Sequence, residues 1–205
     1  MYRLHAIPEP IPLRQAHPDI SDALFLRDAP LNDGRQAREN YLSNLSIAGG
    51  RYRMKIAIGA DHAGYRLKDV IVPFLQELGH DVVDVGCHGP DSVDYPDYAF
   101  SVCEKVVSGD ADKGILLCGT GIGMSIAANK IPGIRCALVH DLFSAKATRE
   151  HNDTNVLAMG ERVVGPGVAQ DIVKVWLETA FSEGGRHIGR INKVKQIEER
   201  QSLHP

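Results

Sequence analysis

The sequence KGILLCGTGIGMSIAANK, residues 113–130, has the plainest structural pattern in the chain. Its first six residues, Lys113–Cys118, are almost all apolar or glycine, which predicts a short buried β-strand. A glycine-rich turn, Gly119–Gly123, comes next, and Met124–Lys130 is predicted to be helical. A strand, a tight glycine turn and a helix in direct succession are typical of α/β proteins with a parallel sheet.

The same alternation continues in both directions from this stretch. Four further strands are predicted at 55–60, 81–85, 134–139 and 155–159, and further helices at 64–78, 95–107, 142–150, 166–181 and 191–201. Strands that alternate with helices at this spacing form βαβ units. We therefore expect a Rossmann-like α/β fold, a three-layer α-β-α sandwich around a five-stranded parallel sheet.

Residues 1–53 differ from the rest of the chain. They hold five of the eleven prolines and no lysine, and only two short stretches, 20–26 and 35–45, have helical character. The Gly49–Gly50 pair then precedes Met54. We expect a flexible N-terminal extension, 1–53, before the α/β domain, 54–205, with Met54 as an alternative start of translation. An arm that packs on a partner subunit, or a targeting segment, is the other interpretation, although six acidic residues argue against a transit peptide.

Composition excludes several classes of protein. The chain has 205 residues, a formal net charge of −3 and 43% hydrophobic residues, which are ordinary values for a globular protein. A mildly acidic chain lacks the basic surface that nucleic-acid binding needs, so no nucleic-acid partner is expected. No apolar run reaches the roughly 18 residues of a membrane helix, and no signal peptide is visible. The cytoplasm is therefore the expected location.

The four cysteines do not form a metal or redox motif. Cys87, Cys103, Cys118 and Cys136 lie 15 or more residues apart, so no C-x-x-C pair exists and no metal site is predicted. Cys118 differs from the others because it ends a predicted strand just before the glycine turn. A helix N-terminus at that place favours the thiolate form of a cysteine. The alternative is a small buried apolar residue, which is how we interpret the other three.

The turn at 119–123 fits none of three familiar phosphate-binding loops. Its G-x-G-x-G spacing is not that of the dinucleotide fingerprint, and no Gly-Lys-Ser/Thr follows as in a P-loop. The arginine of a tyrosine-phosphatase loop would stand at Met124. The backbone N–H groups of such a loop can still converge on an anion, either a phosphate or an oxyanion formed during a reaction.

Other polar residues follow or flank the predicted strands. Ligands of parallel α/β sheets bind beyond the carboxyl ends of the strands, so we expect these residues to form one site there. His62 and His151, beside Asp61 and Asn152, are candidates for acid–base work. Arg186 and Arg190 would share one face of a helix that begins early enough, and two arginines suit a phosphate. An exposed histidine or a solvated basic patch is the plain alternative for each.

These motifs resemble the ribose-5-phosphate isomerase B family, which includes galactose-6-phosphate and allose-6-phosphate isomerases. The resemblance runs from Met54 to about Arg200. It rests on the motifs GADHAG (59–64), DYPDYA (94–99), GILLCGTGIGMSIAANK (114–130), HNDTN (151–155) and GGRH (184–187). It implies an isomerase of a sugar phosphate, without a metal or cofactor. It also implies a homodimer or tetramer in which each active site is built from two chains.

The resemblance assigns a role to each candidate residue. Cys118 would be the base that moves a proton between C1 and C2 through an enediolate. The backbone of Gly119, Gly121, Ile122 and Gly123, with Thr120, would hold the enediolate oxygen. His151, helped by Asp61, would open the sugar ring, and Asn152 would bind hydroxyl groups. The phosphate or sugar would be held by His62, Arg162, Arg186 and Arg190.

Ribose 5-phosphate is the substrate that we expect. An isomerase of allose 6-phosphate, galactose 6-phosphate or a tetrulose phosphate would use the same residues, and a non-catalytic subunit of a hetero-oligomer is a further alternative. The presence of Cys118, His151 and the arginine pair argues against the last of these.

Overall fold

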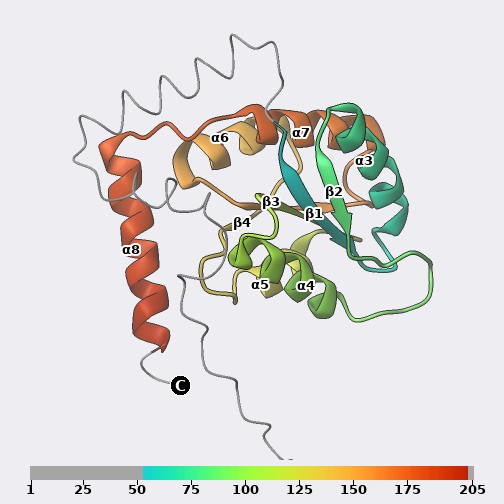
Figure 1. The fold of residues 1–205 in the computed structure, drawn as a ribbon, viewed down its shortest axis with the longest axis horizontal. Coiled ribbons are helices and arrows are strands. Elements are labelled where there is room, and N and C mark those ends of the chain that lie inside the picture. The colour runs from blue at the N-terminus through green and yellow to red at the C-terminus, as the bar shows by residue number, and fades with distance from the viewer. Residues whose placement is uncertain (1–52, 203–205) are drawn as a thin grey trace, which may run out of the picture. The chain divides into compact units, whose positions relative to one another are not determined.

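The computed structural model describes residues 53–202. Strands and helices alternate through this part of the chain (Figure 1). The strands are β1 (Lys55–Ala60), β2 (Asp81–Asp84), β3 (Lys113–Cys118), β4 (Cys136–Leu138) and β5 (Val156–Gly160). The helices are α3 (Tyr65–Glu77), α4 (Tyr95–Ser108), α5 (Ile122–Ala128), α6 (Leu142–Asn152), α7 (Pro166–Glu178) and α8 (Gly185–Ser202). The predicted extension and its two helical stretches lie outside the described residues, apart from Arg53.

The five strands form one parallel sheet in the order β2-β1-β3-β5-β4. Helices α3, α6 and α7 cover one face, and α4 and α5 cover the other (Figure 1). The expected three-layer α/β sandwich is therefore confirmed. The central strands β1, β3 and β5 are buried almost completely because helices shield both of their faces.

Trp176 anchors the larger of the two cores. Its ring is fully buried on α7, against apolar side chains of α3 and the central strands. Its indole Nε1 donates to Oγ1 of Thr154 at 2.9 Å, which satisfies the one polar group of a buried tryptophan. This bond ties α7 to the turn that precedes β5.

Most elements differ from their predicted bounds by one to three residues, and α8 differs by more. Helix α8 begins at Gly185, six residues before the predicted start at 191. Strand β4 has only three residues, because the backbone N–H of Arg135 donates to Oδ1 of Asn155 at 2.8 Å instead of to a neighbouring strand. Hydrophobic periodicity reveals neither feature, because it does not report a helix that begins with glycine or a side chain that takes the place of a strand partner.

Gly64 allows the turn after β1 to pack directly on the end of β3. A Cβ atom at this position would lie 2.5 Å from the carbonyl carbon of Leu117 and 2.7 Å from the nitrogen of Cys118. Both neighbours are backbone atoms, so they cannot rotate away. The expected cost of Gly64→Ala is about 1–3 kcal/mol in the free energy of unfolding, measured by urea denaturation.

Gly167→Ala is the matched control for this substitution. Gly167 lies in α7, and no atom outside its local backbone is within 4 Å of its ideal Cβ position. Alanine there is expected to stabilise the fold by about 0.5–1 kcal/mol, since glycine is a poor helix former. Equal stability of the two variants would contradict this account of Gly64.

Candidate active site

Cys118 and Asp61 lie side by side at the carboxyl edge of the sheet. Cys118 is the last residue of β3, and Asp61 directly follows the neighbouring strand β1. The backbone N–H of Asp61 donates to the carbonyl of Leu117 at 3.1 Å. Both residues are buried, with 5% of Cys118 and 7% of Asp61 exposed. Oδ1 of Asp61 accepts the N–H of Ala63 at 2.8 Å, which fixes the carboxylate beside the start of α3.

The glycine-rich turn, residues 119–123, forms a loop that supplies a hydrogen-bond donor to the thiol of Cys118. The backbone N–H of Gly121 donates to Sγ of Cys118 at 3.0 Å. Gly121 has φ +78, and a Cβ there would lie 2.9 Å from the backbone carbonyl carbon of Met159, so the loop takes this shape only with glycine. An N–H group aimed at sulfur stabilises the thiolate, which is the form that can accept a proton.

Thr120, His62 and Arg162 surround the same loop. Oγ1 of Thr120 accepts the N–H of Ile122 at 3.3 Å and is otherwise exposed. Nδ1 of His62 accepts the N–H of Val93 at 3.3 Å, so the ring is held against the loop that precedes α4. The guanidinium of Arg162 lies against Gly119, whose ideal Cβ position is 3.5 Å from Nε. A positive charge and several polar groups therefore border Cys118 on its open side.

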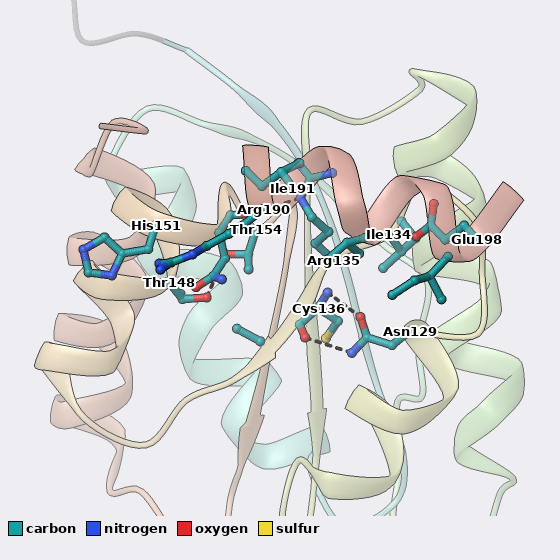
Figure 2. Close-up of a pocket in the computed structure, with 14 residues that line it drawn as sticks. Asn129, Ile134, Arg135, Cys136, Thr148, His151, Thr154, Arg190, Ile191 and Glu198 are labelled. Carbon is teal, nitrogen blue, oxygen red and sulfur yellow. Dashed lines mark hydrogen bonds between the residues drawn. The ribbon is translucent and has the colours of Figure 1, made fainter. Parts of the chain in front are cut away.

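His151, Asn152, Arg186 and Arg190 do not join this group. His151 and Asn152 form the last turn of α6, and Arg186 and Arg190 lie in the first two turns of α8. His151, Asn152 and Arg190 line a cavity of about 430 Å³ between α8 and the start of β4 (Figure 2). Arg135 and Cys136 line the same cavity. The early start of α8 places the two arginines on one helix, as the phosphate hypothesis required.

The two groups lie at opposite ends of the strands: the Cys118 group at their carboxyl ends and the His151 group at their amino ends. Helix α6 runs back from the carboxyl end of β4, so its C-terminal end returns to the edge where the strands begin. Asn155, just past this end, accepts the N–H of Gly114 at the start of β3. From Gly114 to Cys118 the strand rises about 13 Å. Within one chain, the second group therefore does not lie beyond the carboxyl ends of the strands, where one site was expected.

A family model described as Ribose/Galactose Isomerase matches residues 56–194, which include both groups. The chain belongs to this family. Ribose-5-phosphate isomerase B of Escherichia coli is 49% identical over 148 residues, which are 72% of this chain and 99% of that protein. D-erythrulose-4-phosphate isomerase of Pectobacterium atrosepticum is 42% identical over 150 residues, 72% of this chain and 97% of its own length.

A solved structure of ribose-5-phosphate isomerase B from Clostridium thermocellum has the same fold as this chain. It is 54% identical, covers 72% of this chain and 99% of its own, and superposes with a TM-score of 0.71. The resemblance to the ribose-5-phosphate isomerase B family is thus confirmed, and the chain is a member of a family of sugar-phosphate isomerases.

In the HNDTN motif, Asp153, Thr154 and Asn155 stabilise the turn that follows His151 and Asn152. Asp153 has φ +44 and pairs with Arg149 at 2.7 Å and with Arg135 at 3.2 Å. Thr154 receives the indole N–H of Trp176. Oδ1 of Asn155 accepts the backbone N–H of Arg135, in place of a neighbouring strand. The motif thus fixes the place of His151 and Asn152 through buried and partly buried polar contacts.

Two residues near Cys118 were not among the sequence candidates. Nε2 of His140 lies 3.2 Å from the carbonyl oxygen of Thr120, and the ring of Tyr95 packs on Gly123, 2.9 Å from its ideal Cβ position. His140 follows β4, so its place after a strand is a signal that could have identified it. Tyr95 lies within a quoted motif, but only the packing of α4 on α5 brings it to the loop.

The described residues contain no group of three or more histidine, cysteine or acidic side chains arranged to hold a metal ion. Within the same range, no helix is long and apolar enough to cross a membrane.

Proposed function

We propose that this protein interconverts D-ribose 5-phosphate and D-ribulose 5-phosphate through an enediolate, with Cys118 as the base. The main support is the setting of the Cys118 thiol. It is buried at the end of a central strand, receives the N–H of Gly121 and lies beside a loop suited to an anion. Similar proteins named ribose-5-phosphate isomerase B, from two bacteria, support the choice of substrate.

The proton transfer needs one base and one oxyanion trap. With the open-chain aldose bound, the Cys118 thiolate removes the proton on C2, and the electron pair moves to the C1 carbonyl oxygen. Loop N–H groups and Thr120 stabilise the resulting enediolate. The thiol then returns the proton to C1, while the proton of the C2 hydroxyl is transferred to the C1 oxygen. A ketose is formed, and the enzyme is unchanged.

The remaining candidates would bind and open the cyclic sugar. His151 would donate a proton to the ring oxygen, helped by the carboxylate of Asp61, and Asn152 would bind hydroxyl groups. Arg186 and Arg190, one helical turn apart, would hold the phosphate together with His62 and Arg162. The binding energy of the phosphate would then place C1 and C2 at the thiolate.

We further propose that a second copy of the chain completes each active site, in a homodimer or a tetramer built from dimers. In one chain the two groups of site residues lie at opposite edges of the sheet, so a single substrate cannot touch both. Several apolar side chains close to the Cys118 loop are exposed to solvent. They include Phe143, with an exposed fraction of 81%, and Ile122, with 50%. Exposed apolar surface of this kind marks an interface between proteins. A second copy that covers it would bring its own His151 and arginines to Cys118.

The substrate is tested by comparing phosphorylated sugars of four, five and six carbons. The purified full chain should turn over D-ribose 5-phosphate with kcat/KM at least about tenfold above the values for D-erythrulose 4-phosphate, allose 6-phosphate and galactose 6-phosphate. Coupled absorbance or NMR detection of product gives these values directly.

An isomerase of a tetrulose phosphate is the second candidate, because a similar protein is named D-erythrulose-4-phosphate isomerase. A preference for the four-carbon substrate would select this candidate and leave the proposed chemistry of Cys118 in place. Lack of turnover with every sugar, in a folded protein that still binds them, would favour a non-catalytic subunit.

A further inference from the structure

His187 stacks face to face on His151. The ring centroids lie 4.6 Å apart, and the two planes differ by only 4°. His151 is exposed at the end of α6, whereas His187 is buried in the first turn of α8, with 7% of the residue accessible. The proposed roles use His151 and leave the second, buried imidazole without a function.

Arg186 donates a hydrogen bond to the ring of His187. The distance from Nε of Arg186 to Nε2 of His187 is 3.2 Å, and an Nε2 that accepts this bond is that of a neutral imidazole with its proton on Nδ1. Burial lowers the pKa of His187, and the positive charges of Arg186, His151 and Arg190 lower it further. His187 therefore presents an uncharged face to His151 at neutral pH.

The linker between α7 and α8 holds this stack in place. The backbone N–H and Oγ of Ser182 both donate to the carbonyl of Glu150, at 3.1 and 2.6 Å, directly before His151. Nε of Arg149 donates to the carbonyl of Thr179 at 3.3 Å. The His187 ring also passes close to Gly184, whose ideal Cβ position is 3.3 Å from Cδ2. Both ends of the stack are thus fixed by separate contacts.

We propose that His187 is a positioning residue for the isomerisation, one that holds the ring of His151 and remains uncharged while His151 carries a proton. The inference rests on the proposed role of His151 in ring opening. A histidine that donates a proton as imidazolium is positive before the transfer, and a second cation stacked on it would oppose that charge. A neutral partner of the same shape fixes the ring without this repulsion.

Other charged groups surround the pair. Helix α6 contributes Arg149, paired with Asp153, and Glu150, paired with Lys146. Helix α8 contributes Arg186 and Arg190, and Glu183 belongs to the linker. The cations nearest to His187 are the two arginines that are proposed to hold phosphate. Bound phosphate would offset their charge, so the effect of pH is best measured with saturating substrate.

The pH dependence follows from the lowered pKa of His187. The unfolded chain takes up a proton at about pH 6.5, the ordinary value for histidine, whereas the folded chain does so at lower pH. The stabilising effect of the neutral ring is complete above pH 6.5 and is lost as pH falls through the folded pKa. The NMR titration of His187 Cε1–H should therefore be displaced below the ordinary histidine value.

His187→Leu and His187→Phe separate the two parts of the proposal. Leucine removes the flat ring, and kcat is expected to fall about 10- to 100-fold while KM changes little. Phenylalanine keeps the flat ring and removes its titration, so kcat should stay within about threefold of the wild type at neutral pH. In the phenylalanine variant, the loss of kcat at acidic pH should begin at a lower pH than in the wild type.

His88→Gln is the matched control, since it removes a histidine that contacts Lys68 and Asp84 and is not part of the stack, and it should leave kcat and its pH profile unchanged. The inference would be overturned if both His187 variants had the kcat and the pH profile of the wild type. If the leucine variant fails to fold, the phenylalanine variant decides alone: a loss of kcat at the same acidic pH as in the wild type would overturn the inference. Failure of the proposed function is a separate result, namely an inactive wild type or a fully active His151→Ala.

Discussion

Cys118→Ala is expected to lower kcat for D-ribose 5-phosphate by about 10³-fold, within the range found when a general base is removed. The thiol is the group that the loop N–H of Gly121 contacts, and alanine leaves no proton acceptor at that place. Substrate binding should persist, because the proposed phosphate contacts come from His62 and three arginines and not from the thiol. The loss should therefore appear in kcat, with KM changed by less than about fivefold. Steady-state kinetics of the full chain measure both constants.

Cys103→Ala is the matched control for this prediction. Cys103 is fully buried in α4, and burial raises the pKa of its thiol to about 12, so it remains protonated and inert. This variant should retain wild-type turnover, although a small cavity lowers its stability. Cys118→Ser should resemble Cys118→Ala, because a hydroxyl group does not ionise readily at neutral pH. Turnover near the wild-type rate in Cys118→Ala would reject the cysteine as the base.

Two inactive variants are expected to restore activity when their chains are mixed. A Cys118→Ala chain keeps its His151 and arginines, and an Arg190→Ala chain keeps its Cys118. In a dimer with shared sites, the mixed dimer has one site with both halves intact and one with both halves altered. If chains exchange at random, half of the dimers are mixed, so activity should recover to about a quarter of the wild-type value.

His151→Ala mixed with Arg190→Ala is the control. Both substitutions lie in the same half of the site, so no combination of these chains forms an intact site and activity should stay low. The chains are mixed after mild denaturation and refolding, and turnover is compared with that of each variant alone. Absence of recovery in the Cys118 and Arg190 mixture, with exchange verified by mass spectrometry, would show that the sites are not shared.

The sheet could be predicted from the sequence because the strand signals are local. Lys55–Ala60 and Lys113–Cys118 are continuous apolar segments, and both were found with the observed bounds. The glycine turn was likewise visible, as was the position of Cys118 at its start. Hydrophobic periodicity and glycine turns are properties of neighbouring residues, and the right-handed βαβ rule fixes the hand of each connection. The strand order β2-β1-β3-β5-β4 was not predicted and comes from the tertiary structure.

The start of α8 could not be predicted in this way. Gly184, Gly185 and Gly189 suggest a loop, since glycine is a poor helix former. The helix forms there because Ser182 and Arg149 anchor the preceding linker to the end of α6. Contacts between residues about 30 positions apart outweigh the local preference.

The residue types of the candidate site were evident from the sequence, but their arrangement was not. Cys118, His151 and the arginines were identified as chemically capable, and the family follows from their motifs. Their division between two edges of the sheet depends on the direction in which α6 and α8 run. The stack of His187 on His151 depends on the same packing. Local sequence specifies strands, turns and reactive groups, whereas long-range packing determines which of those groups can meet.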